Sequence, residues 1–137
     1  MGKSYDNRWM HRPIIDWEKN ARRQQADTIE ARIFNGTKKL LQIRKQLAII
    51  ADSSNLTWVT PHNIHVATYV RKYGDERFFG AFNFNDAPAY LTWYAFKEHQ
   101  VQSNKLFDHW SGQTYTVGDD REHLIIPSHG FCLLTPA

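Results

Sequence analysis

The sequence has a single cysteine, Cys132, and no apolar run that approaches the length of a membrane span. A lone cysteine excludes an internal disulfide framework and a zinc site built from cysteines. A transmembrane helix needs about 18 or more consecutive apolar residues, so none is expected. The first residues also lack the apolar stretch of a secretory signal. We therefore expect no membrane partner and a cytoplasmic location.

The chain has 137 residues, which is too few for a complete (β/α)₈ barrel, because that fold takes about 250 residues. Disorder is not expected either, since five Trp, six Tyr and eight Phe provide ample apolar area for a core. The length suits one folded domain, with at most a short helical segment attached to it.

Positive charge is concentrated in the first part of the chain. Residues 1–50 carry eleven Lys and Arg against five Asp and Glu (+6), and residues 51–137 carry six against nine (−3), which recovers the total of +3. Most such runs are solvated surface. The chain shows no finger-type Cys/His spacing and no glycine-aromatic strand motif, so no nucleic-acid partner is expected. A basic, helix-led nucleic-acid binder is kept as a third hypothesis, which would require salt-dependent retention on DNA.

One amphipathic helix is predicted over residues 29–50. Residues 1–26 show no helical or strand periodicity, which indicates an extended loop that another surface must order. Asp27 and Glu30 have the spacing of a capping box, and residues 52–55 end the pattern. The apolar stripe repeats at alternating spacings of four and three and comprises Ile29, Ile33, Gly36, Leu40, Ile43, Leu47 and Ile50.

The remainder of the chain is predicted to be mainly β, an antiparallel β-sandwich of seven or eight strands. Residues 64–70 and 77–84 alternate around a turn at residues 73–75, which indicates a hairpin. Turn signals recur about every 8–12 residues, as in sandwiches and barrels. We accordingly divide the chain into residues 1–51 and 52–137. Further strands are expected at residues 89–96, 105–110, 114–117, 123–126 and 131–134.

Few residues in this pattern have the arrangement that catalysis or metal binding requires. His62 and His65 are three apart, which on a strand places them on opposite faces and makes them a poor chelate. Cys132 lies in an apolar strand, where a buried thiol is inert. Asp119 and Asp120 fall in a turn, where carboxylates usually bond the backbone. We expect no metal, no cofactor and no catalytic residue in this chain.

A dense polar and aromatic cluster stands near the start, with the sequence Asp-x-Arg-Trp-x-His-Arg-Pro at residues 6–13 and Asp16-Trp17 after it. Arginine forks bind carboxylates bidentately, and indole faces stack on sugars or guanidinium planes. Two interpretations stay open at this point: recognition of a polar sugar, or a Trp/Arg tie that docks the loop on a neighbouring surface.

This cluster resembles the segment that follows the last barrel strand of amylosucrases, the sucrose-using glucosyltransferases of the α-amylase superfamily. The resemblance continues through Ile43-Arg44, which is similar to the final barrel helix. Residues 69–77 and 81–84 are similar to the first strands of the superfamily's C-terminal domain, residues 107–112 to its Asp-Leu-x-Ser/Thr-Gly turn, and residues 130–136 to its closing strand. The sandwich is thus expected to be of the α-amylase C-terminal-domain type.

The resemblance implies that this chain is the C-terminal part of an enzyme that transfers glucose from sucrose to α-1,4-glucan. The family's nucleophile, acid/base and Asn-His-Asp motifs lie upstream, so the chain alone would be an accessory, structural part without catalysis. Arg8 matches the arginine that pairs with an aspartate at the closed end of the glucose pocket, and His11 and Arg12 would lie near the pocket rim. Its partners would be the missing catalytic barrel and, through it, sucrose and α-glucan.

Two further hypotheses follow from the same residues. Without its barrel, the apolar stripe would pack on the sandwich or on a second copy, so a homodimer through residues 29–50 is also predicted. Alternatively, the chain is a free-standing carbohydrate-binding module with Trp93, Tyr94 and Trp110 as a stacking platform. Because Met1 stands almost at the motif, the chain is interpreted as an expressed fragment or a truncated reading frame.

Overall fold

The computed structural model describes residues 14–116 and 123–137, which form a mainly β protein with one long helix. The chain separates into two compact units, one through Leu40 and the other Leu41–Ala137. The helical elements are α1 (Trp17–Ala21), the 3₁₀ turn η3 (Arg22–Gln24), α2 (Ile29–Gln46), the 3₁₀ turn η4 (Ala48–Ile50) and α3 (Tyr94–Lys97). The strands are β1 (Leu56–Val59), β2 (Val66–Tyr73), β3 (Glu76–Asn83), β4 (Ala89–Thr92), β5 (Lys105–Asp108), β6 (Thr114–Thr116), β7 (His123–Ile126) and β8 (Phe131–Pro136).

An extended loop was predicted for residues 1–26, and the structure describes residues 14–26 of that segment. In these residues the prediction is wrong, because they form short helical turns. The Asp16 carboxylate accepts a hydrogen bond from the Lys19 amide at 2.9 Å and so begins α1. The predicted capping box is also wrong. Asp27 adopts φ 67°, and the Thr28 hydroxyl accepts the Ala31 amide at 3.1 Å instead. An N-cap residue lies immediately before the first helical residue. Because α2 begins at Ile29, that residue is Thr28 and not Asp27.

The long helix ends at Gln46 rather than continuing to residue 50 as predicted. Leu47 leaves the helical region with φ −109° and ψ 96°, and a separate 3₁₀ turn follows. Both Ile43 and Ile49 are buried and contact the sandwich residues Phe78 and Leu133. The last apolar positions of the predicted stripe therefore belong to the sandwich unit, and packing against its sheet decides where the helix ends.

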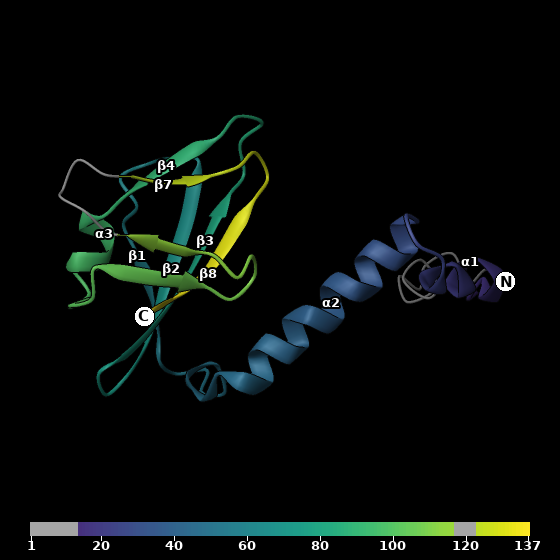
Figure 1. The fold of residues 1–137 in the computed structure, drawn as a ribbon, viewed down its shortest axis with the longest axis horizontal. Helices are drawn as coiled ribbons and strands as arrows, with labels where there is room; N and C mark the ends of the chain where they lie inside the picture. Colours follow the sequence, from purple (N-terminus) through teal and green to yellow (C-terminus); the bar gives the residue numbers. More distant parts are fainter. Residues whose placement is uncertain (1–13, 117–122) are drawn as a thin grey trace, which may run out of the picture. The chain divides into compact units, whose positions relative to one another are not determined.

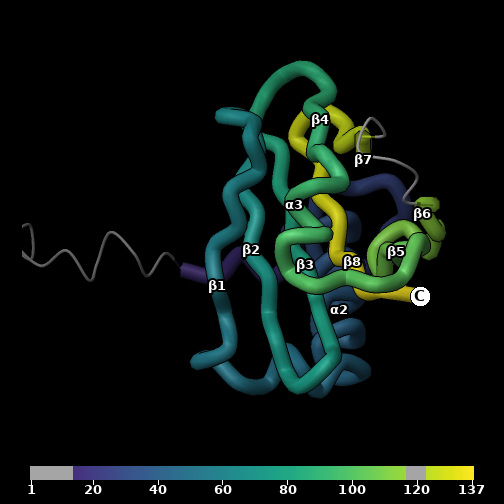
Figure 2. Tube along the Cα trace, turned by 90° about the vertical axis from the view of Figure 1, so that its left-hand side faces the viewer, coloured from purple at the N-terminus to yellow at the C-terminus, as the bar shows by residue number. Residues whose placement is uncertain are grey.

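The strands form two sheets, as the predicted sandwich requires. The larger has the order β1-β2-β3-β8-β5-β6, the smaller pairs β4 with β7, and every pairing is antiparallel. Figure 1 shows the β4–β7 pair as a separate layer, and Figure 2 shows β1, β2, β3 and β8 side by side. The chain changes sheet between β3 and β4, so strands distant in sequence become neighbours.

The predicted hairpin is confirmed, and two other local predictions are corrected. Tyr73 pairs with Glu76 across a two-residue turn in which Gly74 takes φ 52°, as a type II′ turn requires. The run at residues 89–96 is not one strand: β4 ends at Thr92 and a turn of helix follows. That turn places Trp93 and Phe96 together in the core, with ring centroids 5.2 Å apart.

Strand β3 lies in the middle of the larger sheet and is buried on both faces. Phe79 and Ala81 pack into the core between the two sheets, whereas Phe78 packs into a second cluster on the opposite face. Alternate residues of a strand point to opposite faces, so a continuous apolar run is what such a strand needs.

The turn after β5 is built around the buried carboxylate of Asp108. Its Oδ1 accepts the amides of Trp110 and Leu133 at 3.1 and 2.9 Å. Its Oδ2 accepts the Ser111 amide at 3.2 Å and the Ser111 hydroxyl at 2.6 Å. Gly112 closes the turn with φ 76°. The strand predicted at residues 105–110 therefore ends at Asp108, because the next residues bend around this carboxylate.

Candidate docking surfaces

Five rings form a continuous row across the larger sheet on the face opposite β4 and β7, which we call the aromatic face. Consecutive ring centroids lie 4.8–6.3 Å apart, within the range of favourable aromatic pairs. Strand register brings the rings together, since Trp58 pairs with Tyr69 and Phe82 pairs with Phe131. In order across the sheet the five are Trp58, Tyr69, Phe82, Phe131 and Trp110.

A glycine makes room for one of these rings. Gly80 pairs with Tyr69 across β2 and β3, and a Cβ at Gly80 would lie 2.6 Å from two carbons of the tyrosine ring. The ring thus occupies the space that a side chain would fill. A glycine in the interior of a strand commonly marks such a close approach.

Gly80→Ala is expected to lower the free energy of unfolding by about 1–3 kcal/mol, because the methyl group displaces the Tyr69 ring from its contacts with the neighbouring rings of Trp58 and Phe82. Urea titration followed by circular dichroism measures the change. In a Tyr69→Leu background the ring is gone, so the same substitution should cost less than about 1 kcal/mol. Equal costs in both backgrounds would show that the ring does not determine the residue at this position.

The aromatic face is only partly covered. Beside the row, farther along β3 and β8 on the same face, Phe78 and Leu133 are buried together with Ile43 and Ile49. Within the row, Trp58 is 70% exposed, and the other four rings are half-buried. Burial raises the pKa of the Tyr69 phenol, an effect that the positive charge of Arg71 opposes. A contiguous, partly covered apolar surface is typical of an interaction site.

The long helix carries a second exposed apolar surface, the helix stripe. Its members are between 42% and 64% exposed, although a surface helix normally buries such a stripe against a core. Basic residues flank the stripe, among them Arg32 and Lys38. The residues of the helix stripe are Ile29, Ile33, Phe34, Leu40 and Leu41.

The residues singled out from the sequence have different outcomes. Arg8, His11 and Arg12 lie outside the described residues, so their predicted roles stay predictions. The predicted stacking platform is wrong. Trp93 is 2% exposed in the core between the sheets, and Trp110 packs in the cluster on the other face of the larger sheet. Only Tyr94 of the three is exposed, because the turn of helix at α3 directs Trp93 inward.

Neither the family models nor the curated proteins include a match to this sequence. A solved structure, alpha-galactosidase I from Mortierella vinacea, is similar with a TM-score of 0.49 and 22% sequence identity. The alignment covers 74% of this chain but only 28% of the alpha-galactosidase chain.

The polar side chains of the described residues offer no metal centre. No group of three or more His, Cys, Asp or Glu side chains is arranged to hold an ion within residues 14–116 and 123–137. In the same ranges, no helix has both the length and the apolar composition to span a bilayer.

Proposed function

We propose that this chain is the C-terminal, accessory part of an amylosucrase-like enzyme that transfers glucose from sucrose to α-1,4-glucan. The observation that carries the proposal is the helix stripe, an exposed apolar surface on the helix that leads directly into the sandwich. A helix of this kind needs a cover, and the helical layer of a catalytic barrel provides one. The resemblance of residues 6–13 to the amylosucrase segment supports the same partner.

The aromatic face fits this arrangement as a second contact surface. Trp, Tyr and Phe are enriched in the cores of protein interfaces, and beside the five rings Phe78 and Leu133 are already packed with Ile43 and Ile49. Arg8 would pair with the aspartate at the closed end of the glucose pocket, and His11 and Arg12 would line its rim. The β-sandwich itself would perform no chemistry.

A homodimer is the competing cover for the helix stripe. Ile43 is buried against the sandwich, and this favours the barrel as the cover because a helix–helix seam would need the same position. The exposed stripe ends at Leu41, which leaves fewer than the three to four heptads that a stable seam requires. A mass in solution that stays monomeric at every concentration would exclude the dimer.

Fructose release from sucrose tests the proposal. The purified chain alone is expected to release none above buffer background. When it is mixed with an amylosucrase truncated before its own Arg-Trp-x-His-Arg-Pro segment, fructose release should appear. In the mixture, Arg8→Lys should lower the turnover at least about tenfold, because an ammonium group cannot reproduce the guanidinium fork.

Matched variants separate docking from general damage. Ile33→Asp places a charge on the helix stripe and should abolish complementation, whereas Lys38→Ala on the exposed part of the same helix should leave it intact. Both residues are exposed, so circular dichroism should report unchanged folding. Fructose release by the chain alone, or equal complementation by both variants, would contradict the proposal.

A further inference from the structure

The connection between α3 and β5 packs against the tip of the β2–β3 hairpin. We call residues 98–102 of this connection the strap, which forms neither a helix nor a strand. A cleft of about 490 Å³ separates the two, with Asp75 and Arg77 on the hairpin side and Gln100 and Gln102 on the strap side. Directly after the strap, the Ser103 hydroxyl donates to the carbonyl oxygen of the last residue at 2.6 Å.

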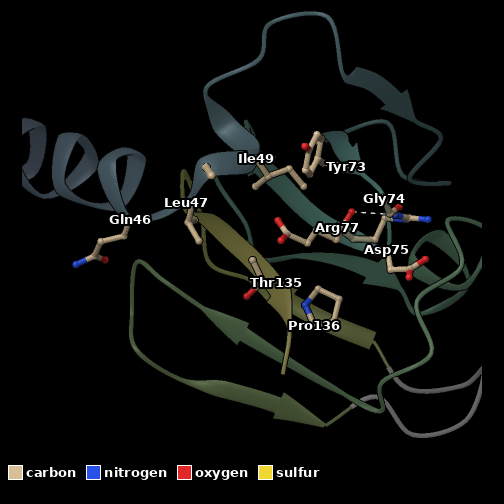
Figure 3. Close-up of a pocket in the computed structure, with 11 residues that line it drawn as sticks. Gln46, Leu47, Ile49, Tyr73, Gly74, Asp75, Arg77, Thr135 and Pro136 are labelled. Carbon is tan, nitrogen blue, oxygen red and sulfur yellow. Dashed lines mark hydrogen bonds between the residues drawn. The ribbon is translucent and has the colours of Figure 1, made fainter.

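A buried arginine ties the strap to the hairpin. Arg77 on β3 is 8% exposed, and Figure 3 shows it beside Gly74 at the hairpin tip. Its Nε donates to the carbonyl oxygen of His99 at 2.9 Å, and its Nη2 donates to Gln100 Oε1 at 3.0 Å. Its Nη1 donates to the carbonyl oxygens of Gly74 and Glu76 at 2.6 and 2.8 Å. All of these acceptors are neutral, so within the described residues no carboxylate neutralises the guanidinium at hydrogen-bonding distance.

The side chain of His99 lies in surroundings that disfavour its protonated form. Its ring packs against the ring of Phe79, with centroids 6.2 Å apart, and its Nδ1 is buried without a hydrogen-bond partner in the described part of the chain. A neutral imidazole can leave one ring nitrogen without a proton, whereas a protonated ring carries a proton on both. Protonation therefore places a donor at a buried position that offers it no acceptor, which is costly.

The charges around the ring act in the same direction. The ammonium group of Lys72 on β2 and the guanidinium of Arg77 on β3 both repel a positive ring, and the carboxylate of Glu98 in the strap opposes them only in part. Burial, and after it Lys72, lowers the pKa of His99 below its ordinary value of 6.5. The strap therefore packs well with a neutral His99 and poorly with a charged one.

The strap also contains a residue whose backbone is under strain. Gln100 has φ 63°, a left-handed conformation that residues other than glycine rarely adopt. The Gln100 side chain accepts the bond from Arg77, and its amide donates to the Lys97 carbonyl oxygen at 2.9 Å. Release of the strap relieves this strain. A segment held by a few bonds opens more readily than a strand in the middle of a sheet.

We propose that the strap is a pH-sensitive device, which protonation of His99 releases from the β2–β3 hairpin. The charged ring turns toward water, away from Lys72 and Arg77, and the bonds from Arg77 to His99 and Gln100 break as it leaves. Release exposes Val101, which packs partly buried against the core between the sheets, and opens the cleft beside Arg77. The device lies within the sandwich unit and does not depend on the catalytic partner proposed above.

The direction of the pH dependence follows from the lowered pKa of His99. In the released strap the ring has its ordinary pKa of 6.5, and in the closed strap it has a lower one. The closed strap is therefore most stable above about pH 6.5, and it loses stability as the pH falls from there toward the lowered pKa.

Amide hydrogen exchange of the whole chain tests the device when it is measured at about pH 7.5 and about pH 5, with correction for the intrinsic exchange rate at each pH. The amides of His99 and Gln100 donate to the carbonyl oxygens of Phe96 and Lys97. Their protection should fall at least about fivefold at the lower pH, because the released state is favoured there. The amides that pair β3 with β8 should keep their protection.

Three variants make the test specific. His99→Phe keeps a ring against Phe79 but cannot be protonated, so protection of the strap should be the same at both pH values. Lys72→Met removes an exposed cation and should make the fall smaller, because less repulsion acts on the charged ring. The matched control is His129→Asn, which removes a histidine that is 65% exposed and lies between β7 and β8. This variant should leave the fall unchanged.

Three results would overturn the proposal. The first is equal protection of the strap at both pH values in the wild-type chain. The second is a fall that persists in His99→Phe, since another group would then be responsible. The third is a fall shared equally by the amides of β3 and β8, because it would report unfolding of the whole sandwich rather than release of the strap.

Discussion

Replacing Asp108 with alanine is expected to lower the free energy of unfolding by about 3 kcal/mol, the largest single effect foreseen for this chain. The substitution removes both carboxylate oxygens. One accepts the amides of Trp110 and Leu133, and the other accepts the amide and the hydroxyl of Ser111. A buried donor left without an acceptor costs about 1–3 kcal/mol. The Leu133 bond is fully buried, so no water replaces the lost carboxylate there.

Two variants make this prediction specific. Asp108→Asn keeps an oxygen for Trp110 and Leu133 but turns an amide donor toward Ser111, so about half of the loss is expected. Asp86→Asn is the matched control, because that side chain is 97% exposed and its contact with His129 lies on the surface. It should change stability by less than about 0.5 kcal/mol. Urea titrations of the three variants rank their free energies of unfolding. Equal stabilities of Asp108→Ala and wild type would refute the role assigned to this carboxylate.

The thiol of Cys132 is expected to react with iodoacetamide about 10³-fold more slowly in the folded protein than in the unfolded chain at pH 8. Burial, and then the negative charge of Asp108, raise the pKa of Cys132 from 9.0 to about 12, although a hydrogen bond with Tyr115 opposes them. At pH 8 the thiolate fraction falls from about one tenth to about 10⁻⁴. The thiolate is the reactive species, so its scarcity alone accounts for the factor.

Labelling can be followed by mass because the chain has one cysteine. A reaction in urea above the unfolding midpoint gives the reference rate. The raised pKa also determines the direction in which stability changes with pH. The unfolded chain loses the thiol proton above about pH 9, whereas the folded chain keeps it until about pH 12. The contribution of Cys132 to stability is therefore complete below pH 9 and is lost as the pH rises between these values. Rapid labelling in native buffer would show that the core around β8 opens readily.

Local patterns predicted the elements whose structure depends on neighbouring residues. The β2–β3 hairpin was predicted because its alternation and its turn residues lie within one short stretch, with Gly74 meeting the need for positive φ. Strand β1 was missed. Trp58 in this strand is 70% exposed, so Leu56–Val59 lacks the regular alternation of a strand with one buried face.

The candidate surfaces were beyond the reach of sequence spacing. The aromatic face draws Trp58, Phe82 and Phe131 from three different strands, and no interval along the chain links them. The alternative platform failed for a related reason, since Trp93 and Trp110 are both near strand ends but lie in clusters on opposite faces of the larger sheet. The pairings of β1 with β2, β2 with β3 and β3 with β8 decide which rings become neighbours.

By itself, the sequence determined the class of the fold. It has too few residues for a complete (β/α)₈ barrel, and its only cysteine excludes an internal disulfide. Its hydrophobic periodicity changes from helical to alternating after residue 50. Periodicity is a property of residues that are near one another in the chain, so it can be recognised from the sequence alone. Tertiary structure decided the rest. It ended α2 at Gln46 and buried Asp108 on β5 and Cys132 on the neighbouring strand β8, because each of these outcomes depends on which distant segment packs at that position.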